Sequence, residues 1–445
     1  MSKTNKMSLG QLTLVTAVNM IGAGIIMLPS QLAQVGAVSV FAWIISTVGA
    51  MSLAYAFAKC GLYSKKGGGL GGYAEYSFGK SGNFLVNFTY AISLIIANVA
   101  IAISIIGYVS EFMGIQLSPI MTAVSTIAVL WICTSGNFGG ARLTGILSGD
   151  SFFGVLIPIL VLIVAGIFFF SGDTYMANWN VQSLPVSQTI TDSIAVTIWG
   201  LLGMESACAN MDAVENPEKN VPLAVLGGTV LAAIINISST SIIFGIVPDS
   251  ELAASTAPFG LVFARMFSPL VGQLINACFI VACVGSLCGW QFTVANVVRD
   301  SARAGFFPKF LIKSIPNGTP MAALISLTLV QTVMALMTIS PSLNEQFMIL
   351  LTLAVVTNLI PFFLSIGSLP RIMRLAGCEG RERILANMAV VIASVYSLYA
   401  CYASGSDAMV YGSLLTFAGW VIYGMMDRND RQTIEQSGMG DSDFA

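Results

Sequence analysis

The sequence predicts an all-α polytopic membrane protein with about twelve transmembrane helices. Of its 445 residues, 56% are hydrophobic and only 9% are charged, whereas soluble domains carry about 25% charged residues. A chain with so few charges cannot cover a surface that faces water. Apolar runs of about 20 residues, the length that a membrane crossing requires, alternate with short polar segments along the whole chain.

Polar residues, glycines and prolines divide the apolar runs into the predicted spans. These are residues 10–34, 38–60, 83–112, 118–137, 146–170, 189–210, 221–247, 270–298, 320–339, 346–369, 384–404 and 408–426. The run that follows Lys3 and Lys6 is too long for a secretory signal peptide and lacks a small-residue cleavage pattern. The tail from Asp427 is polar, and we expect it to be disordered.

The basic residues indicate how the protein is oriented. With an even number of spans, both termini lie on the same side of the membrane. That side carries 18 of the 19 lysines and arginines, and only Arg265 lies in an opposite loop. An excess of lysine and arginine is typical of the cytoplasmic side. We therefore expect both termini in the cytoplasm.

The composition excludes several kinds of chemistry. The sequence has no histidine, and its eight cysteines form no CxxC pair. We therefore expect no metal site, no cofactor and no disulfide framework. Without a metal cluster or a nucleophile elbow an enzyme is a poor interpretation, and one buried carboxylate is weak support for a channel. We expect the lipid bilayer and small molecules as partners, with no nucleic acid.

Glu205 lies in the middle of an otherwise apolar segment, residues 190–210. A charge at the centre of a membrane helix costs about 2.5–3.5 kcal/mol on insertion scales, so it is retained only where it faces a cavity, a partner or a substrate. Gly200 and Gly203 flank it, and Trp199 lies six residues earlier. We interpret Glu205 as the residue that recognises a positively charged ligand.

Glycines also interrupt the first predicted span, at Gly22 and Gly24 on either side of Ala23. Close packing of neighbouring helices explains such glycines about equally well. The first and sixth spans hold equivalent places, however, if the chain consists of two five-helix units and two further helices. Broken helices in equivalent places indicate a transporter site near the membrane midplane, because a half-helix offers free N–H groups to an anionic group.

Residues of other spans fit the wall of such a site. Trp290 lies deep in the eighth span, whereas interfacial tryptophans lie at span ends, so a cavity wall is favoured over core filler. The third span contains Tyr90 and Asn98. An asparagine in this setting more often bonds a neighbouring helix than a ligand.

The segment between the second and third spans is polar and rich in glycine, and we expect it to form a short interfacial helix around residues 73–78. Glu75 there is expected to be solvated or paired with a nearby lysine, with a role at an inner gate as the minority interpretation. Cys60 lies near the end of the second span. Trp420 and Tyr423, near the end of the last span, are expected to belong to the aromatic belt.

Several stretches resemble one known family. They are NMIGAGIIMLP (19–29), GGYAEYSFGKSGNF (71–84), NFGGAR (137–142), GMESACANMDAVENPEKNVP (203–222), STAPFG (255–260), GWQFT (289–293), LMTISPSLN (336–344) and LAVVTN (353–358). In these stretches the sequence is similar to the basic amino acid/polyamine antiporters of the amino acid–polyamine–organocation superfamily. The similarity runs from residue 7 to about residue 424.

The resemblance implies a five-plus-five inverted repeat with broken helices 1 and 6, plus two extra helices. The first repeat would comprise residues 10–170, the second residues 189–369, and the extra helices residues 384–426, flanked by cytoplasmic segments 1–9 and 427–445. It further implies a multi-pass protein of the bacterial inner membrane, often a homodimer. The implied function is exchange of putrescine for ornithine by alternating access.

The family pattern also implies the site residues. Those that bind substrate would be Gly22, Ala23, Gly24, Tyr90, Asn98, Trp199, Glu205 and Trp290, and an inner-mouth set would comprise Cys60, Glu75, Trp420 and Tyr423. In this pattern the glycine segment holds an α-carboxylate and α-amine, the two tryptophans stack on the substrate, and the glutamate binds its charged end.

The sequence departs from the family at Ala23, where GSG is usual. Alanine removes one hydroxyl donor to a carboxylate, which concerns ornithine more than putrescine because putrescine has no carboxylate. Several alternatives stay open: a lysine/cadaverine or arginine/agmatine pair, proton-coupled putrescine uptake, and cation-coupled amino acid symport. Because an empty site would leave Glu205 desolvated, we expect the unloaded carrier to reorient poorly, which favours exchange.

Overall fold

Helices form nearly all of the described part of the chain. The computed structural model describes residues 7–22, 24–66, 69–205, 214–303, 305–337, 339–340 and 342–437. In chain order the helices are α1 (Leu9–Ile21), α2 (Leu28–Ala33), η2 (Ala37–Ser39), α3 (Val40–Tyr63), α4 (Gly69–Met113), α5 (Pro119–Asn137), α6 (Ala141–Gly166), η3 (Ile167–Phe169), α7 (Gly172–Ala177), α8 (Val186–Trp199), α9 (Pro217–Phe244), α10 (Asp249–Ala254), α11 (Pro258–Met266), α12 (Pro269–Arg303), η5 (Lys309–Ile312), α13 (Met321–Met337), α14 (Leu343–Gly367), α15 (Leu369–Leu375), α16 (Gly380–Ala403) and α17 (Ser406–Ser437).

The long helices are those of a membrane protein. Among the described residues, eight helices are long and apolar enough to cross a membrane, namely α3, α4, α5, α9, α12, α14, α16 and α17. Shorter apolar helices occur at Leu9–Ile21, Phe153–Phe169 and Met321–Met337. The prediction of an all-α polytopic membrane protein is therefore confirmed, and the protein is a multi-pass membrane protein.

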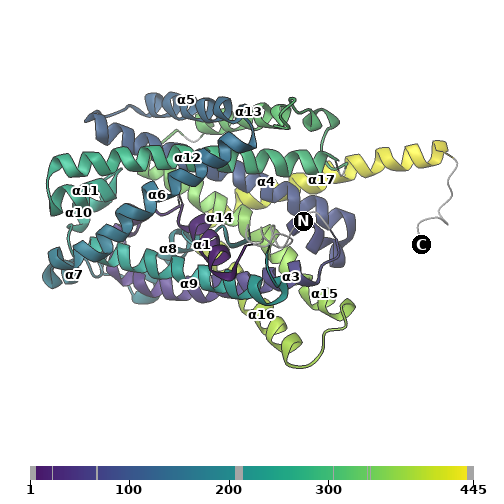
Figure 1. The fold of residues 1–445 in the computed structure, drawn as a ribbon, viewed down its shortest axis with the longest axis horizontal. Helices are drawn as coiled ribbons and strands as arrows, with labels where there is room; N and C mark the ends of the chain where they lie inside the picture. The colour runs from purple at the N-terminus through teal and green to yellow at the C-terminus, as the bar shows by residue number, and fades with distance from the viewer. Residues whose placement is uncertain are drawn as a thin grey trace.

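The helices run roughly alongside one another, and the short ones lie at the ends of the bundle. In Figure 1, α7, α10 and α11 lie at one end and α15 lies towards the other. Helix α4 packs against both α14 and α12, and α1 packs against α9. Helices α1, α8 and α14 lie in the middle of the view, between α12 and α9 (Figure 1). This arrangement encloses the first and sixth spans within the bundle.

Helix α4 joins the polar segment that precedes the third span to the span itself. It begins at Gly69 and bends at Gly79, where the backbone has φ 66° and ψ −163°. Glycine adopts such a left-handed φ without the steric cost that a side chain brings. The part before the bend contains the short helix predicted around residues 73–78.

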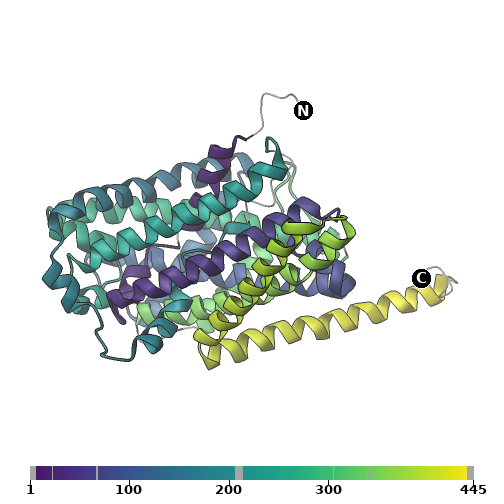
Figure 2. The same ribbon diagram turned by 90° about the horizontal axis from the view of Figure 1, so that it is seen from below.

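Helix α17 is longer than the sequence indicates. It continues through Ser437, and Figure 2 shows it projecting beyond the other helices. The expectation that the tail from Asp427 is disordered stays a prediction. Residues 438–445 lie outside the described residues.

Candidate functional site

The first span is broken, as its glycines predict. Helix α1 ends at Ile21 and α2 begins at Leu28. Gly22 and Gly24 lie in the break, and Ala23 lies outside the described residues. Pro29 occupies the first turn of α2, where its missing N–H has no intrahelical partner to lose. All six residues of α2 are buried, so protein rather than lipid surrounds this half of the span.

The sixth span is also broken, and Gly203 marks the break. Helix α8 ends at Trp199, and Gly203 follows with φ 108°. A Cβ atom at this position would lie 2.7 Å from the carbonyl oxygen of Asn19. Both the backbone conformation and the close approach of α1 therefore require glycine here.

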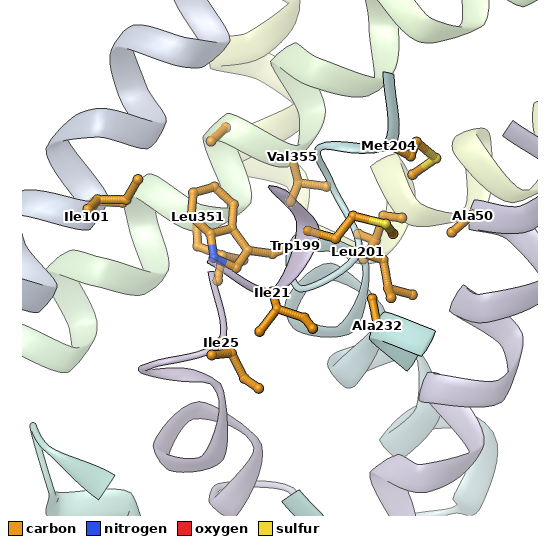
Figure 3. Close-up of a cluster of buried hydrophobic side chains, with 14 of the residues drawn as sticks. Ile21, Ile25, Ala50, Ile101, Trp199, Leu201, Met204, Ala232, Leu351 and Val355 are labelled. Atoms are coloured by element: carbon orange, nitrogen blue, oxygen red, sulfur yellow. The ribbon is translucent and has the colours of Figure 1, made fainter. Parts of the chain in front are cut away.

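The two breaks lie against each other. A Cβ on Gly24 would lie 3.7 Å from the carbonyl oxygen and 3.8 Å from Nε1 of Trp199, which is ordinary van der Waals contact. Figure 3 shows the Trp199 indole on the side of Ile101, whereas Leu201 lies towards Ala232 in the core. The sixth-span break thus has one side packed into the core and another turned towards the first span.

A cavity of about 60 Å³ lies between the two breaks. Its lining consists of Asn19, Met20, Gly24, Leu94, Ala97, Ile101, Trp199, Leu202, Gly203, Glu205, Trp290 and Asn358. One water molecule needs about 10–15 Å³ of such cavity volume, so the cavity has room for several waters or for a short linear molecule. Within this described lining, Glu205 is the one residue with an ionisable side chain.

Glu205 is held in place by hydrogen bonds and is 8% exposed. Its Oε1 accepts a hydrogen bond of 2.9 Å from the Tyr90 hydroxyl. Its Oε2 accepts one of 3.1 Å from the backbone N–H of Gly203. None of the ion pairs between described residues includes Glu205. The carboxylate is therefore oriented by neutral donors, and a cationic ligand can supply the opposite charge.

Of the other predicted substrate-binding residues, some line the cavity and others do not. Trp199 and half-buried Trp290 line the cavity, and buried Tyr90 reaches it through Glu205. Asn98 is 1% exposed and follows Ala97 in α4, but it does not line the cavity. Both polar atoms of the Asn98 amide lack a hydrogen-bond partner among the described residues. Its role as a ligand stays a prediction.

Glu75, from the predicted inner-mouth set, is paired with a lysine, which is one of the two environments expected for it. Its Oε1 lies 2.7 Å from Nζ of Lys66, and its Oε2 accepts a hydrogen bond of 2.7 Å from Asn83. The ring of Tyr423 lies 5.4 Å from that of Phe84, centroid to centroid. Glu75 and Tyr423 therefore contact neighbouring residues of α4.

The two remaining residues of that set differ in burial. Cys60 is fully buried, and its thiol lies 4.0 Å from the carbonyl oxygen of Ser365 in α14. Trp420 is 46% exposed, and its place in the aromatic belt stays a prediction. A direct role of either in binding stays a prediction.

The site predicted from the sequence lacks most of the apolar cavity wall. Leu94, Ala97 and Ile101 line it from α4, and they follow Tyr90 at steps of four, three and four residues. Such steps place side chains on one face of a helix, so extending the helical face from Tyr90 would have found them. Asn358 lies outside the predicted site because a single asparagine in an apolar span gives no indication of the direction it faces.

Comparison with known proteins identifies the family. A sequence model of the amino acid permease family matches residues 7–426. The chain is 53% identical over 425 residues to the putrescine transporter PotE of Escherichia coli (strain K12), covering 96% of this chain and 97% of the relative. The chain belongs to the amino acid permease family. The resemblance found in the sequence is thereby confirmed.

Two further relatives place this permease more closely. It is 52% identical to the putrescine transporter PotE of Haemophilus influenzae, over 96% of this chain and 98% of that protein. It is 33% identical over 376 residues to the cadaverine/lysine antiporter of Escherichia coli (strain K12), over 83% and 84% of the two chains.

In the described part of this permease, no group of three or more histidine, cysteine, aspartate or glutamate residues could hold a metal ion.

Proposed function

We propose that this permease exchanges putrescine for ornithine across the bacterial inner membrane, binding each in turn at the cavity between the two helix breaks. The observation that carries the proposal is the placement of Glu205. It is a buried carboxylate without an ion-pair partner among the described residues, in a cavity that two tryptophans also line. This is an arrangement for a small cation with an apolar stem.

The substrate chemistry fits the lining. Putrescine combines a short methylene chain with two ammonium groups. An ammonium over a tryptophan face gains about 0.5–2 kcal/mol of cation–π attraction, and Trp199 and Trp290 both line the cavity. Glu205 supplies the opposite charge. The apolar side chains of α4 contact the methylene stem.

The same carboxylate explains why exchange is favoured over net transport. An unpaired buried charge is strongly unfavourable, whereas a paired one is tolerated. The empty carrier therefore reorients slowly with Glu205 charged, and a bound cation removes that barrier. Protonation of Glu205 would remove it as well, which gives proton-coupled putrescine uptake as a second mode of the same site.

The printed names of the relatives support putrescine over the alternative pair. Identity to the putrescine transporters is 53% and 52%, against 33% for the cadaverine/lysine antiporter. Cadaverine differs from putrescine by one methylene, and one methylene discriminates by only about 1–3 kcal/mol. Exchange of lysine for cadaverine is therefore the alternative that an experiment must separate.

Counterflow into proteoliposomes tests the proposal. Vesicles containing the purified protein are loaded with ornithine, putrescine, lysine, cadaverine or buffer, and uptake of labelled putrescine is followed with and without sodium and proton gradients. We expect internal ornithine and internal putrescine to drive rapid uptake, with no requirement for sodium. Uptake driven by internal lysine but not by ornithine, or uptake that needs sodium, would contradict the proposal.

A further inference from the structure

One carboxylate faces the cavity, whereas putrescine carries an ammonium group at each end. Glu205 can pair with one end of the molecule. Putrescine and ornithine share one end, a primary ammonium on an unbranched chain. At the other end putrescine has a second ammonium, and ornithine has a carbon that bears both an ammonium and a carboxylate. In the described lining of the cavity, the group that receives this second end must be neutral.

Asn358 has the position and chemistry of that group. It lies in α14, lines the cavity and is 4% exposed. Its Oδ1 is buried without a hydrogen-bond partner among the described residues. Buried polar atoms are nearly always paired in native proteins, and an unpaired one requires an explanation. A ligand in the cavity supplies the missing partner.

The helix around Asn358 presents this side chain to the site. Leu351 and Val355 of α14 lie beside Trp199 in Figure 3, and Asn358 follows on the same helical face at a step of three residues. Pro361 lies inside α14 and has no N–H to donate to the carbonyl of Thr357. A neutral side-chain amide and a released backbone carbonyl therefore occur at adjacent positions of one helix.

We propose that Asn358 is the specificity-determining residue that receives the end at which the two exchanged substrates differ. This inference rests on the proposed exchange of putrescine for ornithine. A carboxamide offers an acceptor oxygen and two N–H donors, and half a turn about its last bond exchanges them. Its oxygen accepts from the second ammonium of putrescine, and its N–H group donates to the carboxylate of ornithine. A carboxylate at this position would serve the diamine and repel the amino acid.

Two variants test the inference by comparing half-saturation concentrations for pairs of substrates. The ratio of two such values does not change when part of the protein is inactive. Asn358→Asp adds a second carboxylate, and we expect the ratio of half-saturation concentrations for ornithine and putrescine to rise at least about tenfold, the effect of one charge-assisted contact. Asn358→Leu removes the donor and the acceptor and puts an apolar side chain of similar size in their place. We expect it to lose most of the preference for putrescine over n-butylamine, a monoamine that lacks the second end.

Asn276→Asp is the matched control. Asn276 is also 4% exposed with an unpartnered Oδ1, but it packs beside Gly260 and does not line the cavity. We expect its two ratios to equal those of the wild type. If the wild type exchanges putrescine for ornithine and both Asn358 variants keep wild-type ratios, the role of Asn358 is overturned while the exchange function stands. If the wild type itself does not exchange the pair, the proposed function fails first.

Discussion

The hydroxyl of Tyr90 donates a 2.9 Å hydrogen bond to Oε1 of Glu205, and this bond joins the third span to the break in the sixth. The second carboxylate oxygen accepts from Gly203 within the same break. Each oxygen of Glu205 thus accepts a hydrogen bond from a neutral donor. The direction in which the carboxylate faces is fixed by neutral groups, and no ion pair among the described residues compensates its charge.

Tyr90→Phe tests this orientation by removing one oxygen atom. The ring keeps its place beside Phe362, 6.3 Å away between centroids, and the carboxylate loses a hydrogen bond of the charged kind, which contributes about 1.5–3 kcal/mol. We expect the half-saturation concentration for putrescine to rise by about tenfold or more, measured by uptake into proteoliposomes. Tyr396→Phe is the control, because it removes an equally buried hydroxyl that bonds Ser46 away from the cavity.

Glu205→Gln separates the charge of the carboxylate from its shape. The glutamine carbonyl can still accept from Tyr90, so we expect the protein to insert and fold normally. The cation loses its opposite charge, and we expect exchange to fall to the background of empty vesicles. Glu251→Gln serves for comparison, since that carboxylate pairs with Arg265 at an exposed position and its loss should leave exchange unchanged. Normal exchange by Glu205→Gln would refute the role of the charge.

The sequence indicated the broken spans, Glu205 and the two tryptophans because each violates a rule for membrane helices. A buried charge, a tryptophan at mid-span and paired glycines are costly unless a cavity explains them. The direction that each residue faces was harder to predict. In α4, 83% of the most apolar window is buried inside the protein, so no lipid-facing stripe fixes the rotation of the helix. Asn98 of α4 therefore belongs to the predicted site but does not line the cavity, whereas Asn358 of α14 lies outside the predicted site and lines it.

Gly203→Ala tests whether the sixth-span break is built on its glycine. An alanine at φ 108° is strained by about 1–2 kcal/mol, and its Cβ would also meet the carbonyl of Asn19 at 2.7 Å. We expect a lower unfolding temperature in detergent and a smaller stabilisation by added putrescine. Gly136→Ala is the control, because Gly136 has no neighbour within 4 Å of an added Cβ. Helix propensity then predicts unchanged stability or a gain of up to about 1 kcal/mol. If the two variants had equal unfolding temperatures and equal stabilisation by putrescine, the break would not depend on glycine at position 203.

The ion pair between Lys66 and Glu75 allows a test of the inner-mouth prediction, because its two partners should act in opposite directions on passing cations. The Lys66 side chain is 42% exposed and that of Glu75 is 23% exposed, and pairs of this kind contribute about 0–1 kcal/mol. The free energy of unfolding should therefore change little in either Glu75→Gln or Lys66→Met. If Glu75 attracts substrate at the entrance, Glu75→Gln slows putrescine uptake from that side, whereas Lys66→Met leaves the carboxylate unpaired and speeds it.

Both effects should weaken as salt is raised, since exposed charges are screened over about 10 Å at 0.1 M. Initial rates at low and high ionic strength measure this directly. If both variants slowed uptake equally at all salt concentrations, the ion pair would instead stabilise the first part of α4, where Asn83 also donates a hydrogen bond to Glu75. The opposite signs are what distinguish a charge that acts on the substrate from one that acts on the fold.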